Sequence, residues 1–336
     1  MSGGSARWGW TLLKLMVAVG VVWFLLSQGK LDLTLFINGA ISFEIIVVAL
    51  VCNFITFFFS ALRWHVLLRS QKVVLPFSWV HSMTYLCVCF NMLVPGAVGG
   101  DAMRMGYAAQ AVPDRKGATI LTVFADRFVG LYALLVLSLL GILIAFSTVM
   151  AVTPLKFMFF VITVIVVGGP LLLVVLLILL PRIPWLRNYI DTPRPGRIWH
   201  LFNTVIDSVR HFVRAKGQLF LALLLSVLAQ GFQVVSLIWI AMSLDMMTIP
   251  VQSFFVAAPL AWVANILPIS PGGLGVGEAA FDQMCHWLQP VQTATAFGTV
   301  FFINRIFQMT ASLPGFYVYI FYKKKQPSTS TTYTKT

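Results

Sequence analysis

The chain has 336 residues, of which 59% are hydrophobic and only 10% are charged. Its mean hydropathy of +0.91 lies far above that of water-soluble domains, so the composition predicts a protein that crosses a membrane several times. The formal net charge of +13 would suggest a nucleic-acid partner in a soluble protein. Because no basic stripe with interleaved aromatic residues occurs outside the predicted cytoplasmic loops, we expect no such partner.

Several apolar segments are long enough to cross the hydrocarbon core, which takes about 20 residues of α-helix. In chain order, these spans are predicted at about 11–27, 41–62, 119–149, 155–180, 218–243 and 293–320. The first could be mistaken for a signal peptide, but no small-residue cleavage site follows it cleanly, and we expect a retained helix.

Two further apolar stretches, at about 76–112 and 252–288, are interrupted in the middle by proline and glycine. Each leaves two limbs that are too short to span the bilayer comfortably. Such limbs suit a re-entrant helical hairpin, in which the irregular backbone lines a cavity or is covered by protein.

The distribution of basic residues indicates the orientation. If the N-terminus lies inside, only Lys30 and Lys156 fall in outside loops, whereas most other lysines and arginines fall in inside regions. This bias predicts that both termini are cytoplasmic. The longest inside segment carries apolar residues at spacings of three and four over 197–214, which predicts an amphipathic helix on the inner leaflet.

The two interrupted stretches resemble each other. The sequence NMLVPGAVGGDAM (91–103) and the sequence NILPISPGGLGVGEAAF (265–281) both contain an asparagine, a proline-glycine break and an acid followed by alanine. Downstream, VFADRF (123–128) corresponds to VFFINRIF (300–307). Repeated broken helices at corresponding places are typical of transporters, whose substrate site lies near the bilayer midplane.

These observations predict an all-α polytopic membrane protein with about six full spans and two re-entrant helical hairpins, arranged as an inverted repeat. The first half would cover 1–150 and the second 151–322, followed by a cytoplasmic tail at 323–336. Each half makes three net crossings, so the second half starts on the opposite side of the membrane from the first.

The candidate site combines the breaks with charges inside the membrane. Arg127 and Arg305 lie well within their spans, where a charge costs at least about 2.5–3.5 kcal/mol and calls for a partner or a function. Asp101 and Glu278 begin the return limbs and could accept backbone N–H groups there. The predicted substrate-binding residues are Asn91, Gly99, Gly100, Asp101, Arg104, Asp126, Arg127, Asn265, Gly272, Gly273, Gly275, Glu278, Asn304 and Arg305.

Two interpretations of these residues remain open. The acids could cap helices and pair with the arginines as braces between the halves. Alternatively, the arginines and the glycine-rich helix starts could bind the phosphate of a lipid, with the acids competing for the same guanidinium groups. Asn91 and Asn265 could end the entering limbs or donate hydrogen bonds to a headgroup. No CxxC or HExxH spacing occurs, so we expect no metal site, cofactor or catalytic residue.

The combination of NMLVPGAVGGD, VFADR, ISPGGLGVGE and the following Asn-Arg pair resembles the lysylphosphatidylglycerol synthase transmembrane-region family, the flippase-like domain of multiple peptide resistance factor proteins. The resemblance implies movement of a phospholipid, or of a related anionic or aminoacylated lipid, between leaflets of a bacterial or archaeal cytoplasmic membrane. Aminoacylating members carry a soluble synthase domain after the membrane region. Here the chain continues only through KKKQPSTSTTYTKT, so we expect a stand-alone member without lipid aminoacylation; its lipid and oligomeric state stay open.

The main alternative function is a membrane glycosyltransferase or another lipid-modifying enzyme. A polyprenyl-sugar transferase is expected to offer acidic residues in a sizeable outer loop, for metal and sugar. The predicted outer loops are short and contain only Asp32 and Asp245 as acids. A non-transporting assembly subunit is a third class, but the large partner domain or tail expected of it is not evident in the sequence.

Overall fold

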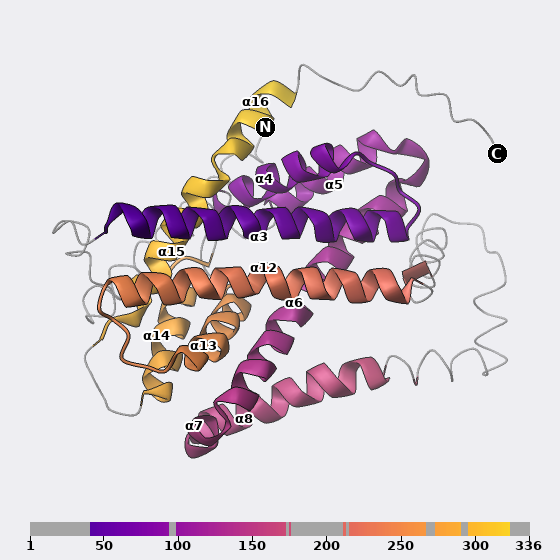
Figure 1. Ribbon diagram of the computed structural model, residues 1–336. Helices are drawn as coiled ribbons and strands as arrows, with labels where there is room; N and C mark the ends of the chain where they lie inside the picture. The colour runs from indigo at the N-terminus through magenta and orange to yellow at the C-terminus, as the bar shows by residue number, and fades with distance from the viewer. Residues whose placement is uncertain are drawn as a thin grey trace, which may run out of the picture.

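The computed structural model describes residues 41–93, 99–172, 175, 211–212, 215–266, 273–289 and 295–322, and the regular secondary structure in these ranges is helical (Figure 1). The α-helices are α3 (Phe43–Ser70), α4 (Phe77–Leu93), α5 (Gly99–Ala111), α6 (Lys116–Ile144), α7 (Phe146–Ala151), α8 (Thr153–Thr163), α12 (Lys216–Ser243), α13 (Val251–Ala264), α14 (Val276–Leu288), α15 (Phe297–Ser312) and α16 (Pro314–Tyr322). The predicted span at 11–27 and nearly all of the predicted amphipathic helix at 197–214 lie outside the described residues.

Four described helices are long and apolar enough to cross a membrane: Phe43–Ser70, Pro113–Ile144, Thr153–Leu172 and Lys216–Ser243. The composition therefore predicted the class of protein correctly. The third of these helices is α8 continued through a π-helical turn at Val164–Gly168.

Three helices differ in their bounds from the predicted spans. The span predicted to end at 62 continues as α3 to Ser70, because the apolar run after Arg63 keeps packing inside the protein. The span predicted at 119–149 divides near Ala145 into α6 and α7. The span predicted at 293–320 divides at Leu313 into α15 and α16, because Pro314 cannot donate the backbone hydrogen bond that a continuous helix needs.

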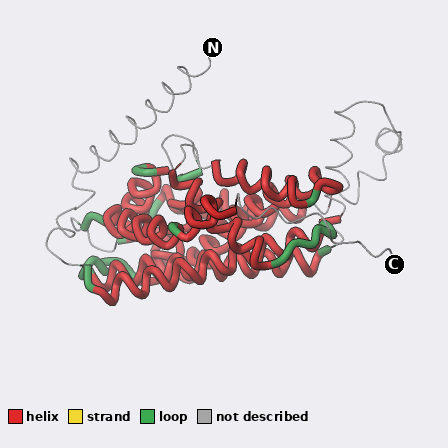
Figure 2. Tube along the Cα trace, turned by 90° about the horizontal axis from the view of Figure 1, so that it is seen from above, coloured by secondary structure: helices red, strands yellow, loops and turns green. Residues whose placement is uncertain are grey.

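The helices α3 and α12 lie side by side through the middle of the molecule (Figure 1). Seen from above, the described helices lie packed against one another (Figure 2). The chains of α3 and α12 run in opposite directions, since contacts that advance along α3 move backward along α12. Thr56 Oγ1 donates to the carbonyl of Ala229 at 3.0 Å, and Arg63 Nη1 donates to Ser226 Oγ at 3.1 Å.

Both interrupted stretches form pairs of short helices. The helices α4 and α5 have 17 and 13 residues, and α13 and α14 have 14 and 13. At about 1.5 Å rise per residue, α5, α13 and α14 are too short to cross a hydrocarbon core of about 30 Å. The helical breaks thus lie where the sequence places them, while the re-entrant course of each pair remains a prediction.

Glycine permits two close helix crossings between segments far apart in the chain. The helix α6 packs against α13, and a Cβ on Gly141 would lie 2.7 Å from the backbone of Phe255. The helix α16 packs against α4, and a Cβ on Gly315 would lie 2.3 Å from the carbonyl oxygen of Tyr85. The entering limb of each broken pair is therefore held by a helix from the other half of the sequence.

Candidate functional site: buried arginine–carboxylate clusters at the helix breaks

The first ion pair joins the start of α5 to α6. Asp101 lies in the first turn of α5, and its Oδ2 is 2.5 Å from Nε of Arg127. The Asp101 residue is buried, whereas the Arg127 side chain is 51% exposed on the protein surface. Cys87 on α4 donates its thiol to the other carboxylate oxygen at 3.2 Å. The pair thus has one face packed in protein and an arginine that a ligand could reach.

The second ion pair joins the start of α14 to α15. Glu278 Oε1 accepts from Arg305 Nε at 2.6 Å, and the two side chains are 1% and 10% exposed. Its other oxygen accepts the backbone N–H of Gly275 at 2.7 Å and so caps the helix start. Gly275 has a φ of 85°, which a residue with a Cβ would adopt only under strain. The acid therefore fixes the helix start and neutralises the arginine at once.

The two pairs share one construction. In each, the acid in the first turn of a return limb binds the arginine of the helix that follows. The structure thus brings together Asp101 with Arg127, and Glu278 with Arg305, as the sequence comparison suggested.

A third cluster contains a residue that the sequence analysis missed. Arg63 on α3 binds Asp126 on α6 through two parallel hydrogen bonds, Nε to Oδ1 at 2.6 Å and Nη2 to Oδ2 at 3.0 Å. Arg104 on α5 donates from Nη1 to the same Oδ2 at 2.9 Å. Asp126 is therefore shared by two arginines and is not the partner of its neighbour Arg127. We call Arg63, Arg104 and Asp126 the arginine triad.

Neighbouring side chains hold the arginine triad in place. The Arg104 guanidinium lies over the ring of Trp64 at 3.5 Å from its centroid, a cation–π geometry. A Cβ on Gly130 would come within 3.1 Å of Arg63 Nη1, so the missing side chain leaves room for this guanidinium. In the part of the chain that the structure describes, Nε and Nη2 of Arg104 are buried and have no hydrogen-bond partner.

The position corresponding to Asp126 in the second half is Asn304, and its surroundings are neutral. The amide of Asn304 accepts from Ser236 Oγ at 2.7 Å and donates to Gln233 at 3.3 Å. Gln233 in turn donates to Asn53 on α3 at 2.8 Å. This buried amide network joins α3, α12 and α15 without using a charge.

The predicted asparagines and glycines lie at the breaks. Asn91 accepts the backbone N–H of Gly100 at 2.9 Å, so this side chain ties the end of α4 to the start of α5, which begins at Gly99. Asn265 caps the end of α13.

Glycine makes room for both asparagines. A Cβ on Gly100 would meet Asn91 Oδ1 at 2.9 Å, and one on Gly277 would meet Asn265 Oδ1 at 2.3 Å. Gly273 has a φ of 72°, and its carbonyl accepts from Arg305 Nη2 at 3.3 Å. Gly272 lies outside the described residues.

Arg63 was missed because it was assigned to a cytoplasmic loop. The signal that could have placed it is the run Trp64–Leu68, which is still apolar apart from His65 and so continues the helix. Ser226, Gln233 and Ser236 carried no signal, because lone polar residues in an apolar helix do not reveal which distant residue they contact.

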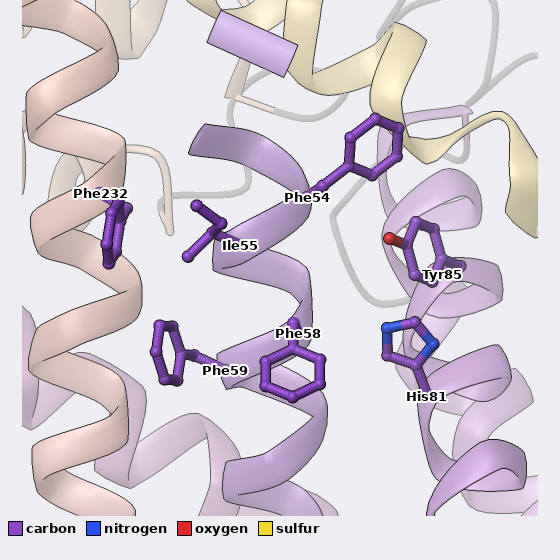
Figure 3. A pocket seen from close by; sticks show the side chains of 7 residues that line it. All are labelled: Phe54, Ile55, Phe58, Phe59, His81, Tyr85 and Phe232. Atoms are coloured by element: carbon purple, nitrogen blue, oxygen red, sulfur yellow. The ribbon is translucent and has the colours of Figure 1, made fainter. Parts of the chain in front are cut away.

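An apolar groove follows the outer surface of α3. Figure 3 shows Phe232 of α12 on one side, and His81 and Tyr85 of α4 on the other. The remaining lining residues all come from α3: Phe54, Ile55, Phe58 and Phe59. Phe59 stacks on Phe232 with ring centroids 6.0 Å apart, so aromatic rings bridge the two central helices here.

One comparison with known proteins identifies a family for this chain. A family model described as "Lysylphosphatidylglycerol synthase TM region" matches residues 11–312, which includes the helix breaks and all three charged clusters. No curated protein matches the chain significantly. In the described ranges, no three His, Cys, Asp or Glu side chains are grouped closely enough to hold a metal ion.

Proposed function

The chain belongs to the lysylphosphatidylglycerol synthase transmembrane-region family, and we propose that it moves a phospholipid, or a related anionic or aminoacylated lipid, between leaflets of a bacterial or archaeal cytoplasmic membrane. It does so without covalent chemistry, as a transporter and not as an enzyme. The observation that carries this proposal is the repeated acid–arginine pair at the two helix breaks. In the proposed topology, such pairs offer exchangeable charge along the path that a lipid headgroup takes through hydrocarbon.

An inverted repeat is part of the proposal. Its halves would pair α3 with α12, α4 and α5 with α13 and α14, and α6 with α15 and α16. The central helices have 28 residues each, and their contact between Thr56 and Ala229 joins the same position, halfway along both. A contact between equivalent positions in antiparallel helices is what a twofold axis at that point produces. The reciprocal packing of α6 on α13 and of α16 on α4 supports the same axis.

The proposed topology has about six spans and two re-entrant hairpins, with both termini in the cytoplasm. The hairpin tips would then meet near the midplane. There the two glycine-rich helix starts and the two acid–arginine pairs would line the path of the headgroup, while the lipid chains stay in the hydrocarbon.

The arginines are suited to this task because they can change partners. A lipid phosphate competes with Asp101 for Arg127 and with Glu278 for Arg305, since a guanidinium binds either oxyanion through two parallel hydrogen bonds. When the headgroup leaves, the carboxylate pairs with the arginine again. The arginine is therefore never left unpaired in the membrane, and the lipid is not held permanently.

Reconstitution tests the proposal. Purified protein in liposomes should equilibrate a labelled phospholipid between the leaflets without any other component. We expect Arg127→Gln and Arg305→Gln to slow this movement strongly. Arg69→Gln serves as the matched control, because Arg69 is an exposed residue in the last turn of α3 and its replacement removes the same charge outside the proposed path.

Two results would contradict the proposal. One is leaflet exchange no faster than in protein-free liposomes. The other is conversion of the lipid into a new product, which would favour the membrane glycosyltransferase or another lipid-modifying enzyme.

A further inference from the structure

The two halves differ in charge at corresponding positions around the candidate site. Arg63 and Ser236 occupy the same position in α3 and α12, and Asp126 and Asn304 both precede the paired arginine. Arg104 follows Asp101 by three residues, as Phe281 follows Glu278. The three charged residues of the arginine triad therefore correspond to three neutral residues in the second half. If the triad only held helices together as part of the repeat, the second half should carry the same charges.

The arginine triad carries one positive charge more than its carboxylate neutralises. Its residues are largely buried, with side-chain exposures of 12% for Arg63, 5% for Arg104 and 3% for Asp126. A buried excess charge is costly, and proteins usually retain one where an anion binds. The described part of the chain provides no second acid in contact with Arg63 or Arg104.

The unused hydrogen-bond donors lie on the edge of Arg104 that suits an oxyanion. Arg63 grips Asp126 with its Nε and Nη2, which is the two-donor edge that matches carboxylate and phosphate geometry. Arg104 uses Nη1 for Asp126 and leaves the equivalent edge, Nε with Nη2, buried and without a partner among the described residues. A phosphate at this edge would complete the guanidinium's hydrogen bonds and neutralise the triad.

An apolar surface adjoins the triad along α3. Phe59 lies one helical turn before Arg63, and residues four apart lie on the same helix face. The stacked pair of Phe59 and Phe232 thus places the apolar groove of Figure 3 one helical turn along α3 from Arg63, on the same face of that helix. Hydrocarbon chain and anion could therefore be held side by side, which favours an amphiphile over a free ion.

We propose that the arginine triad is a phosphate-binding subsite for a lipid headgroup, with the Nε and Nη2 edge of Arg104 as its principal donor and the groove along α3 receiving a hydrocarbon chain of the same lipid. This inference deepens the proposed transport function and rests on it. In this structure the edge is buried beside Trp64, so a headgroup reaches it only after the covering side chains move. Arg127 is exposed, so it is placed to meet the headgroup before the buried triad does. Its ion pair with Asp101 holds the start of α5, the helix that carries Arg104.

The test measures binding separately from transport. Detergent-solubilised full-length protein is titrated calorimetrically with dihexanoyl-phosphatidylglycerol, with dihexanoylglycerol, which lacks the phosphate, and with inorganic phosphate. We expect the phospholipid to bind more tightly than either other probe. Loss of hydrogen bonds to a charged group should weaken phospholipid binding about 10- to 100-fold in Arg104→Gln.

Two further variants sharpen the result. Arg104→Lys keeps the charge but loses the two-donor edge, so it should also bind weakly. Arg69→Gln, on α3 and exposed, should bind as the unmodified protein does. Arg104→Gln should still fold, because Arg63 continues to neutralise Asp126; if it does not, Arg104→Lys decides the question.

Normal phospholipid binding by a folded Arg104→Gln or Arg104→Lys variant would overturn the subsite. Inorganic phosphate binding as tightly as the phospholipid would overturn the lipid assignment. If the unmodified protein binds the phospholipid as expected but moves none across liposomes, the subsite stands and the transport function fails. If it moves lipid and Arg104 has no effect on binding, the function stands and the subsite fails.

Discussion

At the scale of single residues, the two acid–arginine pairs differ in how far water or lipid can reach them. The Arg305 side chain is 10% exposed and that of Arg127 is 51% exposed. Removing one member of a buried pair leaves the other charge without compensation, whereas an exposed arginine contributes little to stability. The same construction therefore holds its two helices more tightly in the second half, while both arginines keep the proposed exchange of carboxylate for lipid phosphate.

We predict that Arg305→Gln lowers the free energy of unfolding by about 3–5 kcal/mol, because Glu278 would stay buried and unpaired. Arg127→Gln should cost less than Arg305→Gln, because the Arg127 side chain is half exposed and Asp101 keeps the hydrogen bond from the Cys87 thiol. Denaturant unfolding in detergent, followed by circular dichroism, measures both. Adding Glu278→Gln to Arg305→Gln should restore part of the loss, and equal losses in the two single variants would contradict the prediction.

At the scale of helices, the close contact of α4 with α5 depends on a glycine. A Cβ on Gly100 would lie 2.0 Å from the carbonyl oxygen of Cys87, whereas one on Gly106 would meet nothing within 4 Å. The first position faces the partner helix and the second is exposed on the other side of the same helix. These two glycines separate the effect of helix propensity from the effect of packing.

We predict that Gly100→Ala destabilises the protein, because the colliding atom belongs to the backbone of α4 and cannot rotate away. Gly106→Ala should be neutral, or stabilising by up to about 1 kcal/mol, since alanine favours a helix over glycine. Thermal unfolding of the two variants in the same detergent gives the comparison. If Gly100→Ala were as stable as Gly106→Ala, the packing of α4 on α5 would not be as described.

The sequence was informative about features that are local in the chain. Pro95 and Gly96, and the similar group near Gly273, indicated that each apolar stretch divides into two helices, and the apolar runs indicated the long helices but not all of their ends. The division between α15 and α16 also had a local signal, Pro314 itself, which we overlooked because it lies within a long apolar run. Arg63 was misplaced because charge alone was taken to end a helix, although the charge is neutralised by a residue 63 positions away.

At the scale of the whole molecule, the arrangement depends on contacts that no local pattern reveals. The helix α3 packs on α12, and α4 and α13 each pack on a helix from the other half of the sequence. These contacts join surfaces that are distant in the sequence. Sequence comparison predicted which residues correspond, such as Arg127 with Arg305. It could not show that Asp126 and Asn304, although aligned, sit in a charged and a neutral environment respectively.

The topology of the first broken pair gives the last prediction. Val74 lies in the connection between α3 and α4 and is 79% exposed, and Asp114 lies exposed between α5 and α6. If α4 and α5 enter and leave by the same face, cysteines at these two positions should both react with a membrane-impermeant maleimide from the cytoplasmic side only. A cysteine at the exposed Lys156 should react from the opposite side and serves as the control for sidedness.

The four native cysteines are buried, so the introduced thiols should dominate the signal. The same result is expected whether the limbs turn back at the midplane or cross fully, because both paths return the chain to its starting side. Val74→Cys and Asp114→Cys reacting from opposite sides would mean an odd number of crossings between them. The two halves would then no longer be inverted, and Asp101 and Glu278 could not approach a common path from opposite leaflets.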